Sequence, residues 1–416
     1  MWKTVSVDWW IKRRKSGISS VQEAVEEIVG SVRSGGDQAL RELTARFDGI
    51  TLDEIRIEES RIESAYHEVN NALVESLIEA EARISRFHEM QMPKKLWLEQ
   101  VEPGIVLGVK TTPLERIGAY VPGGRAAYPT TALMCAVPAR VAGVSSICCC
   151  TPPPVHPATL VAMDIAGVDE VYSVGGAQAI AAMALGTESI KPVQKIVGPG
   201  NVYVTMAKML MRDHAEIDFP AGPSEIAILA DESGDAEYIA ADILAQAEHD
   251  PNAACLLITT DQDLAIEVGK WLDAMVPTAP RNEIITQSLE NAGYLIVNTL
   301  ADGVEMANKV AAEHLSLQVA DPLSILEGIR HAGSIFIGKY SSVACGDYAS
   351  GTNHVLPTAG YARTYSGLDV RHFIKNTSIQ IISREGLEAI GDIVEHIARS
   401  EGLHAHADSV SIRRKK

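Results

Sequence analysis

The sequence has few aromatic residues, no paired cysteine motif and no long apolar run. Aromatic residues make up only 5% of its 416 residues. Its six cysteines form no C-x-x-C pair, so neither a zinc ribbon nor a redox dithiol is indicated. The sequence contains no run of about 18 apolar residues, the length needed to span a membrane. The N-terminal M-W-K-T-V-S-V-D-W-W also lacks the apolar stretch of a signal peptide. We therefore expect a cytoplasmic protein.

Positive charge is also scarce. Lys and Arg number 36 against 54 Asp and Glu, which gives a formal net charge of -18. Nucleic acids and anionic membranes are bound by basic residues that neutralise phosphates, so the composition excludes both as expected partners. At roughly 100 to 200 residues per domain, a chain of this length should form two to four domains.

The first 90 residues are expected to be mainly helical. Residues 1–12 contain three of the five tryptophans and are too short to fold alone, so they should pack on another part of the chain. Apolar residues recur at helical spacing over 20–47 and 53–90, with a predicted break at Gly35-Gly36. His67 and His88 lie among many charged residues here and are expected at the surface.

After Pro103 short apolar strands alternate with glycine turns and alanine-rich helices. This alternation is typical of parallel strands joined by crossover helices, and therefore of an α/β fold. Two series of strands predict two Rossmann-like parallel-sheet domains, with helical N-terminal and C-terminal extensions. The predicted strands are 117–121, 147–151, 170–174 and 195–197 in one series, and 226–229, 254–259, 294–297 and 334–337 in the other, with a further strand at 379–383.

A polar helix face spans residues 242–250, which read D-I-L-A-Q-A-E-H-D. At about 100° per residue, Asp242, Gln246 and His249 fall on one side of this predicted helix. An amide oxygen and a neutral imidazole on one face could form half of a metal site, although a solvated polar face gives the same pattern.

Three later segments carry further titratable residues. Glu313-His314 opens the alternating strand L-S-L-Q-V, where a carboxylate and an imidazole could act as general acid and base, or form a structural pair. Asp347 and His354 lie in a glycine-rich loop, and Glu401, His404 and His406 lie near the C-terminus. Such oxygen and nitrogen donors suit Zn²⁺, with Mn²⁺ or Co²⁺ as alternatives.

Three glycine turns could bind a dinucleotide phosphate at the start of a helix. They are Pro122-Gly123-Gly124, Gly175 to Gln178, and Gly198 to Asn201. None matches G-x-G-x-x-G followed by an acidic residue, so tight turns between strand and helix would also explain each of them.

Taken together, these motifs resemble the histidinol dehydrogenase family along nearly the whole chain. The matching segments are, in order, Y-V-P-G-G with A-A-Y-P-T-T-A-L-M, V-G-G-A-Q-A-I-A-A, G-P-G-N, A-G-P-S-E, Q-A-E-H-D, A-E-H-L, G-T-N-H-V-L-P-T and H-A-H.

The resemblance implies a role for each matching residue. It implies one Zn²⁺ per subunit on Gln246, His249, Asp347 and His406, and Glu313 and His314 as the catalytic proton-transfer pair. It implies NAD contacts from Tyr120, Gln178 and Asn201. The implied substrate-binding residues are Ser224, His354 and Glu401, together with His314 and the four metal ligands.

The resemblance also implies the reaction and the assembly. L-Histidinol would be oxidised through histidinal to L-histidine in the last steps of histidine biosynthesis, with two NAD⁺ consumed and zinc orienting the substrate. The family's homodimer implies a shared active site, in which Glu401 and His406 act on the partner subunit.

Together, these expectations divide the chain into four parts. They are an arm at 1–12, a first α/β domain at 13–119 plus 226–365, a second Rossmann-like domain that contacts NAD at 120–225, and a C-terminal segment at 366–416 that reaches the partner.

Two other functions remain as alternatives. One is a related NAD-dependent oxidation of another small polar alcohol, such as a sulfonated diol, by the same residues. The other is a non-catalytic scaffold that binds a metal or a nucleotide, which the intact Glu313-His314 pair disfavours.

Overall fold

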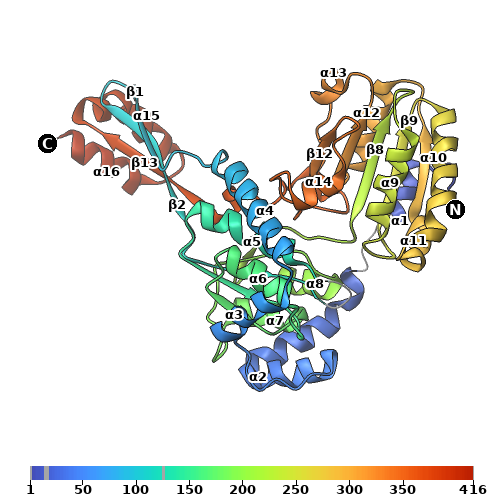
Figure 1. Cartoon of the computed structure of the whole chain (residues 1–416). Coiled ribbons are helices and arrows are strands. Elements are labelled where there is room, and N and C mark those ends of the chain that lie inside the picture. The colour runs from blue at the N-terminus through green and yellow to red at the C-terminus, as the bar shows by residue number, and fades with distance from the viewer. Residues whose placement is uncertain (1, 14–17, 124–126, 416) are drawn as a thin grey trace. The chain divides into compact units, whose positions relative to one another are not determined.

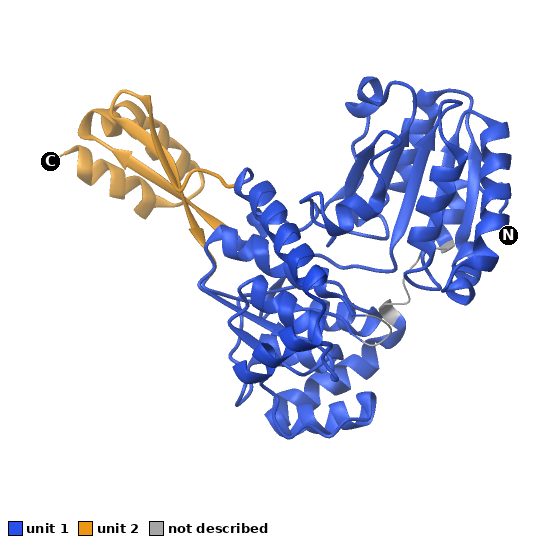
Figure 2. Cartoon of the chain, viewed as in Figure 1, with its two compact units in different colours: residues 1–91, 115–373 blue, residues 92–114, 374–416 orange. Residues whose placement is uncertain are grey.

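The computed structural model describes residues 2–13, 18–123 and 127–415, which form two compact units (Figure 2). Unit 1 comprises residues 1–91 and 115–373, and unit 2 comprises residues 92–114 and 374–416. Unit 1 contains two five-stranded sheets in which every pairing is parallel, so the predicted fold class is confirmed.

The first five-stranded sheet of unit 1, which we call the β3 sheet, has the strand order β5-β4-β3-β6-β7. Its strands are β3 (Arg116–Tyr120), β4 (Ser146–Cys150), β5 (Glu170–Tyr172), β6 (Lys195–Val197) and β7 (Glu216–Ile217). The helices around it are α2 (Gln22–Asp48), α3 (Glu59–Glu68), α4 (Asn71–Glu89), α5 (Pro129–Ala142), α6 (Pro157–Ile165), α7 (Gly176–Leu185) and α8 (Val202–Leu210) (Figure 1).

The second, the β8 sheet, has the order β10-β9-β8-β11-β12. Its strands are β8 (Glu225–Ala230), β9 (Ala254–Thr259), β10 (Ala292–Ile296), β11 (His314–Gln318) and β12 (Ser334–Ile337). Its helices are α1 (Val7–Arg13), α9 (Ala236–Ala247), α10 (Gln262–Met275), α11 (Asn282–Ser288), α12 (Leu300–Val310), α13 (Pro322–Leu326) and α14 (Val343–Tyr348).

Helices cover both faces of the β8 sheet, which explains why its strands read as nearly continuous apolar runs. Ile226 and Ile228 of β8 belong to one core with residues of α9 and α10. The alternate residues Ala227 and Leu229 belong to a second core with residues of α1 and α12. Successive side chains of a strand point to opposite faces, so one strand contributes to both cores.

The N-terminal arm packs on the β8 sheet, as its tryptophans predict. Trp10 is completely buried. The amide of Val5 donates to the carbonyl of Tyr294 at 2.9 Å, and Nε1 of Trp2 donates to the carbonyl of Ala265 at 2.8 Å. The arm therefore pairs with the edge strand β10, an edge that would otherwise be open to another chain.

The N-terminal helices pack differently from the division expected from the sequence. The break at Gly36 is present, with φ 51° and ψ -133° inside α2. However, Val25 and Leu40 of α2 share a core with Tyr120 of the β3 sheet, whereas the expected division placed residues 13–119 with the β8 sheet. Periodicity shows that a helix has a buried face, but not which sheet covers it.

The two histidines of this region also differ from each other. His67 is exposed, as expected. His88, which was expected at the surface, is completely buried, with Nδ1 2.8 Å from the carbonyl oxygen of Ile84. A hydrogen bond within its own helix satisfies one ring nitrogen there.

Unit 2 is an antiparallel sheet with the order β1-β2-β13 and two helices. Its elements are β1 (Leu96–Glu102), β2 (Ile105–Pro113), β13 (Ile374–Ile382), α15 (Arg384–Ser400) and α16 (His404–Arg414). The sequence did not predict the β1–β2 hairpin, and it placed the last strand at 379–383. β1 reads L-W-L-E-Q-V-E, without the apolar alternation that marks a half-buried strand, and all of its residues are exposed.

Among the described residues, no helix is long and apolar enough to cross a membrane.

Asp242 lies on the buried side of α9 and gives a prediction about pH and stability. It is 8% exposed, and burial raises its pKa from 3.8 to about 6, while a hydrogen bond from the amide of Val343 opposes the rise. A raised pKa means that the folded state binds the proton more tightly than the unfolded state does. The ionised form therefore destabilises the fold, and stability falls as the pH rises from about 4 to about 6.

We expect Asp242→Asn to raise the free energy of unfolding by up to about 3 kcal/mol at pH 8, since the pKa rises from 3.8 to about 6 and each pKa unit corresponds to about 1.4 kcal/mol. At pH 3 the difference from wild type should largely vanish, because Asp242 is then mostly protonated in both states. Urea denaturation at the two pH values measures this difference, and an equal effect at both would contradict the assignment.

Candidate active site

The candidate residues of unit 1 lie where the chain reverses its direction across each sheet. In the β3 sheet, β4 and β5 lie on one side of β3, and the chain then returns to add β6 on the other side. The β8 sheet has the same reversal between β8 and β11. Crevices at such reversals, outside the carboxyl ends of the strands, are the usual binding sites of open α/β sheets.

The expected site residues lie at opposite edges of the two sheets. Tyr120 ends β3 and Gly198 follows β6, so the expected cofactor residues lie at the carboxyl edge of their sheet. Glu225 and His314 are the first residues of β8 and β11, so the expected proton-transfer pair lies at the amino edge of the other sheet.

Glu313 and His314 form a buried pair at this amino edge. Their residues are 5% and 4% exposed. Oε2 of Glu313 accepts a hydrogen bond of 2.9 Å from the amide of Glu225 and lies 3.6 Å from Nδ1 of His314. Nδ1 of His314 lies 3.3 Å from the carbonyl oxygen of Glu225. The backbone of Glu225 therefore fixes both side chains.

Both side chains of the pair have raised pKa values. Burial raises the pKa of Glu313 to about 7, although the charge of His314 works against the rise. Burial alone would lower the pKa of His314, because it disfavours the charged ring. The nearby Glu313 and Asp347 outweigh this effect and raise the pKa of His314 to about 9. A carboxyl group that titrates near pH 7 is suited to general acid and base chemistry.

Asp347 faces the other nitrogen of His314. Its Oδ1 lies 3.7 Å from Nε2 of His314. Burial tends to raise the pKa of Asp347, but the nearby His314 holds that pKa below its usual value. Asp347 is therefore an anion beside the ring.

His354 is held between Asp347 and α5. Its Nδ1 lies 2.9 Å from the backbone carbonyl oxygen of Asp347, and its Nε2 lies 3.4 Å from Oγ1 of Thr131. Burial lowers the pKa of His354, so its ring is neutral near pH 7. Sequence reasoning missed Thr131, although it lies in the A-A-Y-P-T-T segment that carries part of the resemblance.

The two expected metal ligands of the α9 segment have contrasting surroundings. Gln246 is 3% exposed, and its Nε2 is buried with no hydrogen-bond partner among the described residues. His249 lies just beyond α9 and is exposed at the surface. Partial burial of the ring lowers the pKa of His249. The charge of His314 lowers this pKa further, whereas the charge of Asp347 raises it. The imidazole of His249 is thus available as a neutral donor.

The other expected ligands lie in unit 2. Glu401 follows the last residue of α15 and His406 lies in α16, and both are exposed. Among the described residues, no group of three His, Cys, Asp or Glu side chains is placed to hold a metal ion.

Tyr120 and the turn before Gln178 are joined by a hydrogen bond at the carboxyl edge of the β3 sheet. The amide of Gly176 donates to the Tyr120 hydroxyl at 3.1 Å. Burial raises the pKa of Tyr120 to about 12, so it stays protonated. Gln178 is 2% exposed, and its Oε1 is buried without a partner among the described residues. An unpaired buried amide oxygen marks a place where a ligand could complete the hydrogen bonding.

Asn201 begins α8 as its N-cap. Its Oδ1 accepts from the amides of Tyr203 and Val204 at 3.0 and 3.1 Å. Because the side-chain oxygen is committed to the cap, only the amide NH₂ of this exposed residue can serve a ligand.

Two of the glycines in these turns have a packing reason. A Cβ on Gly175 would collide with Pro152, and a Cβ on Gly198, whose φ is +114°, would collide with the carbonyl oxygen of Tyr120. Both glycines are therefore required by the fold whether or not a phosphate binds there. Gly124, in the third turn, lies outside the described residues.

Ser224 directly precedes Glu225, and its carbonyl accepts from the amide of Ala254 at 3.1 Å. The sequence predicts no role for Glu225, which belongs to the A-G-P-S-E segment. An acidic residue at the start of a predicted buried strand was a signal that could have drawn attention to it.

Comparisons with known proteins identify the family of the chain. The family model described as histidinol dehydrogenase matches residues 11–414. A histidinol dehydrogenase of Methanosarcina barkeri is 53% identical over 404 residues, which cover 96% of this chain and 93% of that protein. A histidinol dehydrogenase of Bacillus cereus is 46% identical over 398 residues, covering 95% and 92%.

A crystal structure gives the same result. The histidinol dehydrogenase of Elizabethkingia anophelis superposes with a TM-score of 0.95 at 35% identity, and the match covers 100% of this chain and 97% of that one. The chain belongs to the histidinol dehydrogenase family.

Proposed function

We propose that the chain catalyses the NAD-dependent, four-electron oxidation of L-histidinol through histidinal to L-histidine, the last steps of histidine biosynthesis. The observation that carries this proposal is the buried Glu313-His314 pair, with Asp347 beside it, in a chain of the histidinol dehydrogenase family. A reaction with two oxidations and one hydration needs more than one proton-transfer group, and the pair supplies two.

The donors near His314 fit Zn²⁺. His249 is neutral, Asp347 is anionic and Gln246 offers a buried amide, which are nitrogen and oxygen donors of the kind that zinc accepts. We propose that these three residues and His406 hold the ion. When bound, zinc would orient the substrate and polarise its oxygen. Asp347 would then share its charge with the ion, so the pKa of His314 would fall toward the range of a useful base.

The carboxyl edge of the β3 sheet fits NAD. Gln178 offers an unpaired buried amide oxygen, Asn201 offers an amide NH₂, and Tyr120 supports the turn at the start of α7. The N-termini of α7 and α8 lie at this edge, where helix amides favour a phosphate. When bound, NAD⁺ would accept the hydride in each oxidation step.

The residues of the chain would then act in sequence. Ser224, His354 and Glu401 would bind the substrate, and His314 would take the proton of the alcohol as the first hydride leaves. Glu313 would take a proton from the water that attacks the aldehyde, which gives the hydrate. His314 would take a proton from the hydrate as the second hydride leaves, so one water is consumed and two hydrides are transferred.

We further propose a homodimer in which Glu401 and His406 complete the partner's site. Unit 2 exposes several large apolar side chains, among them Trp97 at 42%, Ile393 at 58% and Ile397 at 54%. Ile393 and Ile397 lie four residues apart on α15, so they form one apolar stripe. Apolar surface of this kind is typical of protein interfaces. The cytoplasmic location expected from the sequence stays a prediction.

The proposed reaction is tested by its stoichiometry. Purified protein supplied with Zn²⁺, NAD⁺ and limiting L-histidinol should form two NADH for each L-histidinol, with L-histidine as the product. Oxidation of a sulfonated diol but not of L-histidinol would favour the related alcohol dehydrogenase instead. No NADH with either substrate would favour the non-catalytic scaffold.

The role of His314 gives a second prediction. His314→Asn should lower the rate of alcohol oxidation by about 10²- to 10⁴-fold, the usual contribution of a positioned general base. NADH binding and zinc content should remain, because neither is assigned to this side chain. His67→Asn, which changes an exposed histidine of the same unit, should keep wild-type activity. Near-normal turnover by His314→Asn would remove its assignment as the base.

Sharing of the metal site between subunits gives a third prediction. Asp347→Asn and His406→Asn should each abolish most zinc binding and activity, since each removes a proposed ligand. If His406 serves the partner, co-expression of the two variants should restore about a quarter of the wild-type activity, because half of the dimers would be mixed and each mixed dimer would hold one intact site.

Elemental analysis of the co-expressed sample should show the same recovery of zinc. No recovery, together with a dimer by light scattering, would place His406 in its own subunit's site. A monomer by light scattering would refute the dimer.

A further inference from the structure

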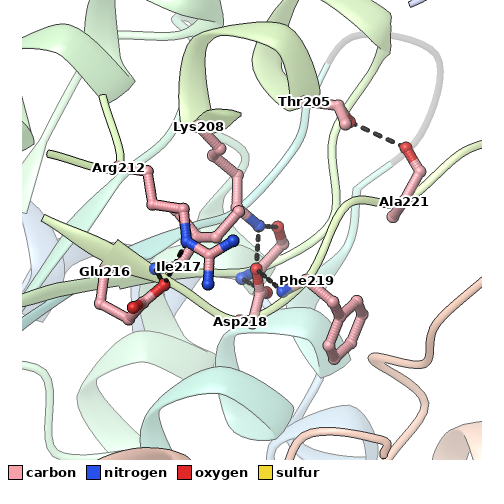
Figure 3. A network of polar contacts seen from close by, with 9 residues as sticks. Thr205, Lys208, Arg212, Glu216, Ile217, Asp218, Phe219 and Ala221 are labelled. Carbon is pink, nitrogen blue, oxygen red and sulfur yellow. Dashed lines mark hydrogen bonds and ion pairs between the residues drawn. The ribbon is translucent and has the colours of Figure 1, made fainter. Parts of the chain in front are cut away.

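A buried ion pair near the cofactor turn has no part in the proposed chemistry. Lys208 lies in α8, and Asp218 directly follows β7 (Figure 3). Their side chains are 4% and 1% exposed and form a salt bridge. Burial of two charges removes their hydration, so a pair of this kind persists only where further hydrogen bonds satisfy both groups. Those further bonds show what the pair holds.

The pair holds both polar groups of the Gly198 backbone. The amide of Gly198 donates to Oδ2 of Asp218 at 2.8 Å. Nζ of Lys208 donates to the carbonyl oxygen of Gly198 at 3.0 Å. Gly198 is the first residue of the turn that leads to Asn201, and it lies so close to Tyr120 that an added Cβ would collide with the carbonyl oxygen of Tyr120. Two of the three proposed NAD contacts therefore adjoin a residue that the pair immobilises.

The segment that follows Asp218, residues 219–221, is bonded both to Asp218 and to α8. The amide of Phe219 donates to Oδ1 of Asp218 at 2.7 Å. Thr205, one turn before Lys208 on α8, donates from Oγ1 to the carbonyl of Ala221 at 2.9 Å (Figure 3). The pair is thus anchored to a segment that is itself bonded to α8, which gives the turn a rigid support.

The charged groups are suited to this task because of the number of bonds they make. The two oxygens of Asp218 accept from the amides of Gly198 and Phe219 and from Lys208, and the ammonium group has three donors. An apolar pair of the same size would fill the space but would leave the Gly198 amide and carbonyl without these partners. A role in packing alone would not require these bonds.

We propose that Lys208 and Asp218 are positioning residues for NAD. They hold the turn of residues 198–201 in the conformation that receives the cofactor, and they do so through Gly198 rather than by touching substrate or cofactor. This inference rests on the proposed NAD site at the carboxyl edge of the β3 sheet.

The test is NADH binding by the zinc-loaded protein, measured by fluorescence, with steady-state kinetics alongside. The double variant Lys208→Met with Asp218→Asn removes both charges, so it leaves no unpaired buried ion. Its Kd for NADH and its KM for NAD⁺ should rise about tenfold or more, since small displacements of binding groups have large effects. The kcat at saturating NAD⁺ should change much less than this KM.

A matched control comes from another ion pair of the same sheet. Arg116 and Glu170 are 13% and 17% exposed and begin β3 and β5, so they lie at the amino edge, away from the turn. The double variant Arg116→Met with Glu170→Gln should lower the melting temperature but keep the Kd for NADH within about twofold, as expected for distant sites.

The outcomes separate the two proposals. An equal rise of Kd for both double variants, or a lower melting temperature with unchanged NADH binding by the Lys208 and Asp218 variant, would overturn the positioning role. Absence of NADH binding by the wild-type protein would overturn the NAD site itself, and this inference with it. If the double variant fails to fold, Lys208→Arg keeps the charge but changes the donor geometry, and the same rise of Kd is expected.

Discussion

The hydrogen bond from the Glu225 amide to the Glu313 carboxylate fixes the centre of the site. It joins two residues 88 positions apart, at the amino ends of neighbouring strands. A buried carboxylate is stable only with such a partner, so the bond determines where the acid lies. The ring of His314 is then confined between the carbonyl of Glu225 and Asp347. The acid and base groups therefore depend on the register of the sheet rather than on a loop.

The two sheets divide the chemistry between opposite edges. The carboxyl edge of the β3 sheet carries the starts of α7 and α8, whose amides suit the phosphates of a dinucleotide. The amino edge of the β8 sheet carries a carboxyl group and an imidazole with raised pKa values, which suit proton transfer. Each task lies at an edge whose local electrostatics are favourable.

The parts that the sequence predicted are those that local patterns determine. Short apolar runs of three to six residues identified most strands of both sheets, and Gly36 marked the break in α2. The β1–β2 hairpin was missed because the apolar residues of β1 do not alternate with polar ones and every residue of β1 is exposed. The roles of the site residues came from family resemblance, because residues 246 and 347 share no local pattern. Lys208 and Asp218 are a pair only in the folded chain.

The folding of unit 2 depends on the order in which its strands are synthesised. Its middle strand, β2, bonds on one side to β1 and on the other to β13, and the bonded side chains of Thr111 and Asn376 are 265 residues apart. On the ribosome the hairpin emerges early, and one edge of β2 stays open until nearly the whole chain has been made. An open edge invites pairing with other chains. Chains released early would thus be prone to aggregate, and only a complete chain can close the unit that carries Glu401 and His406.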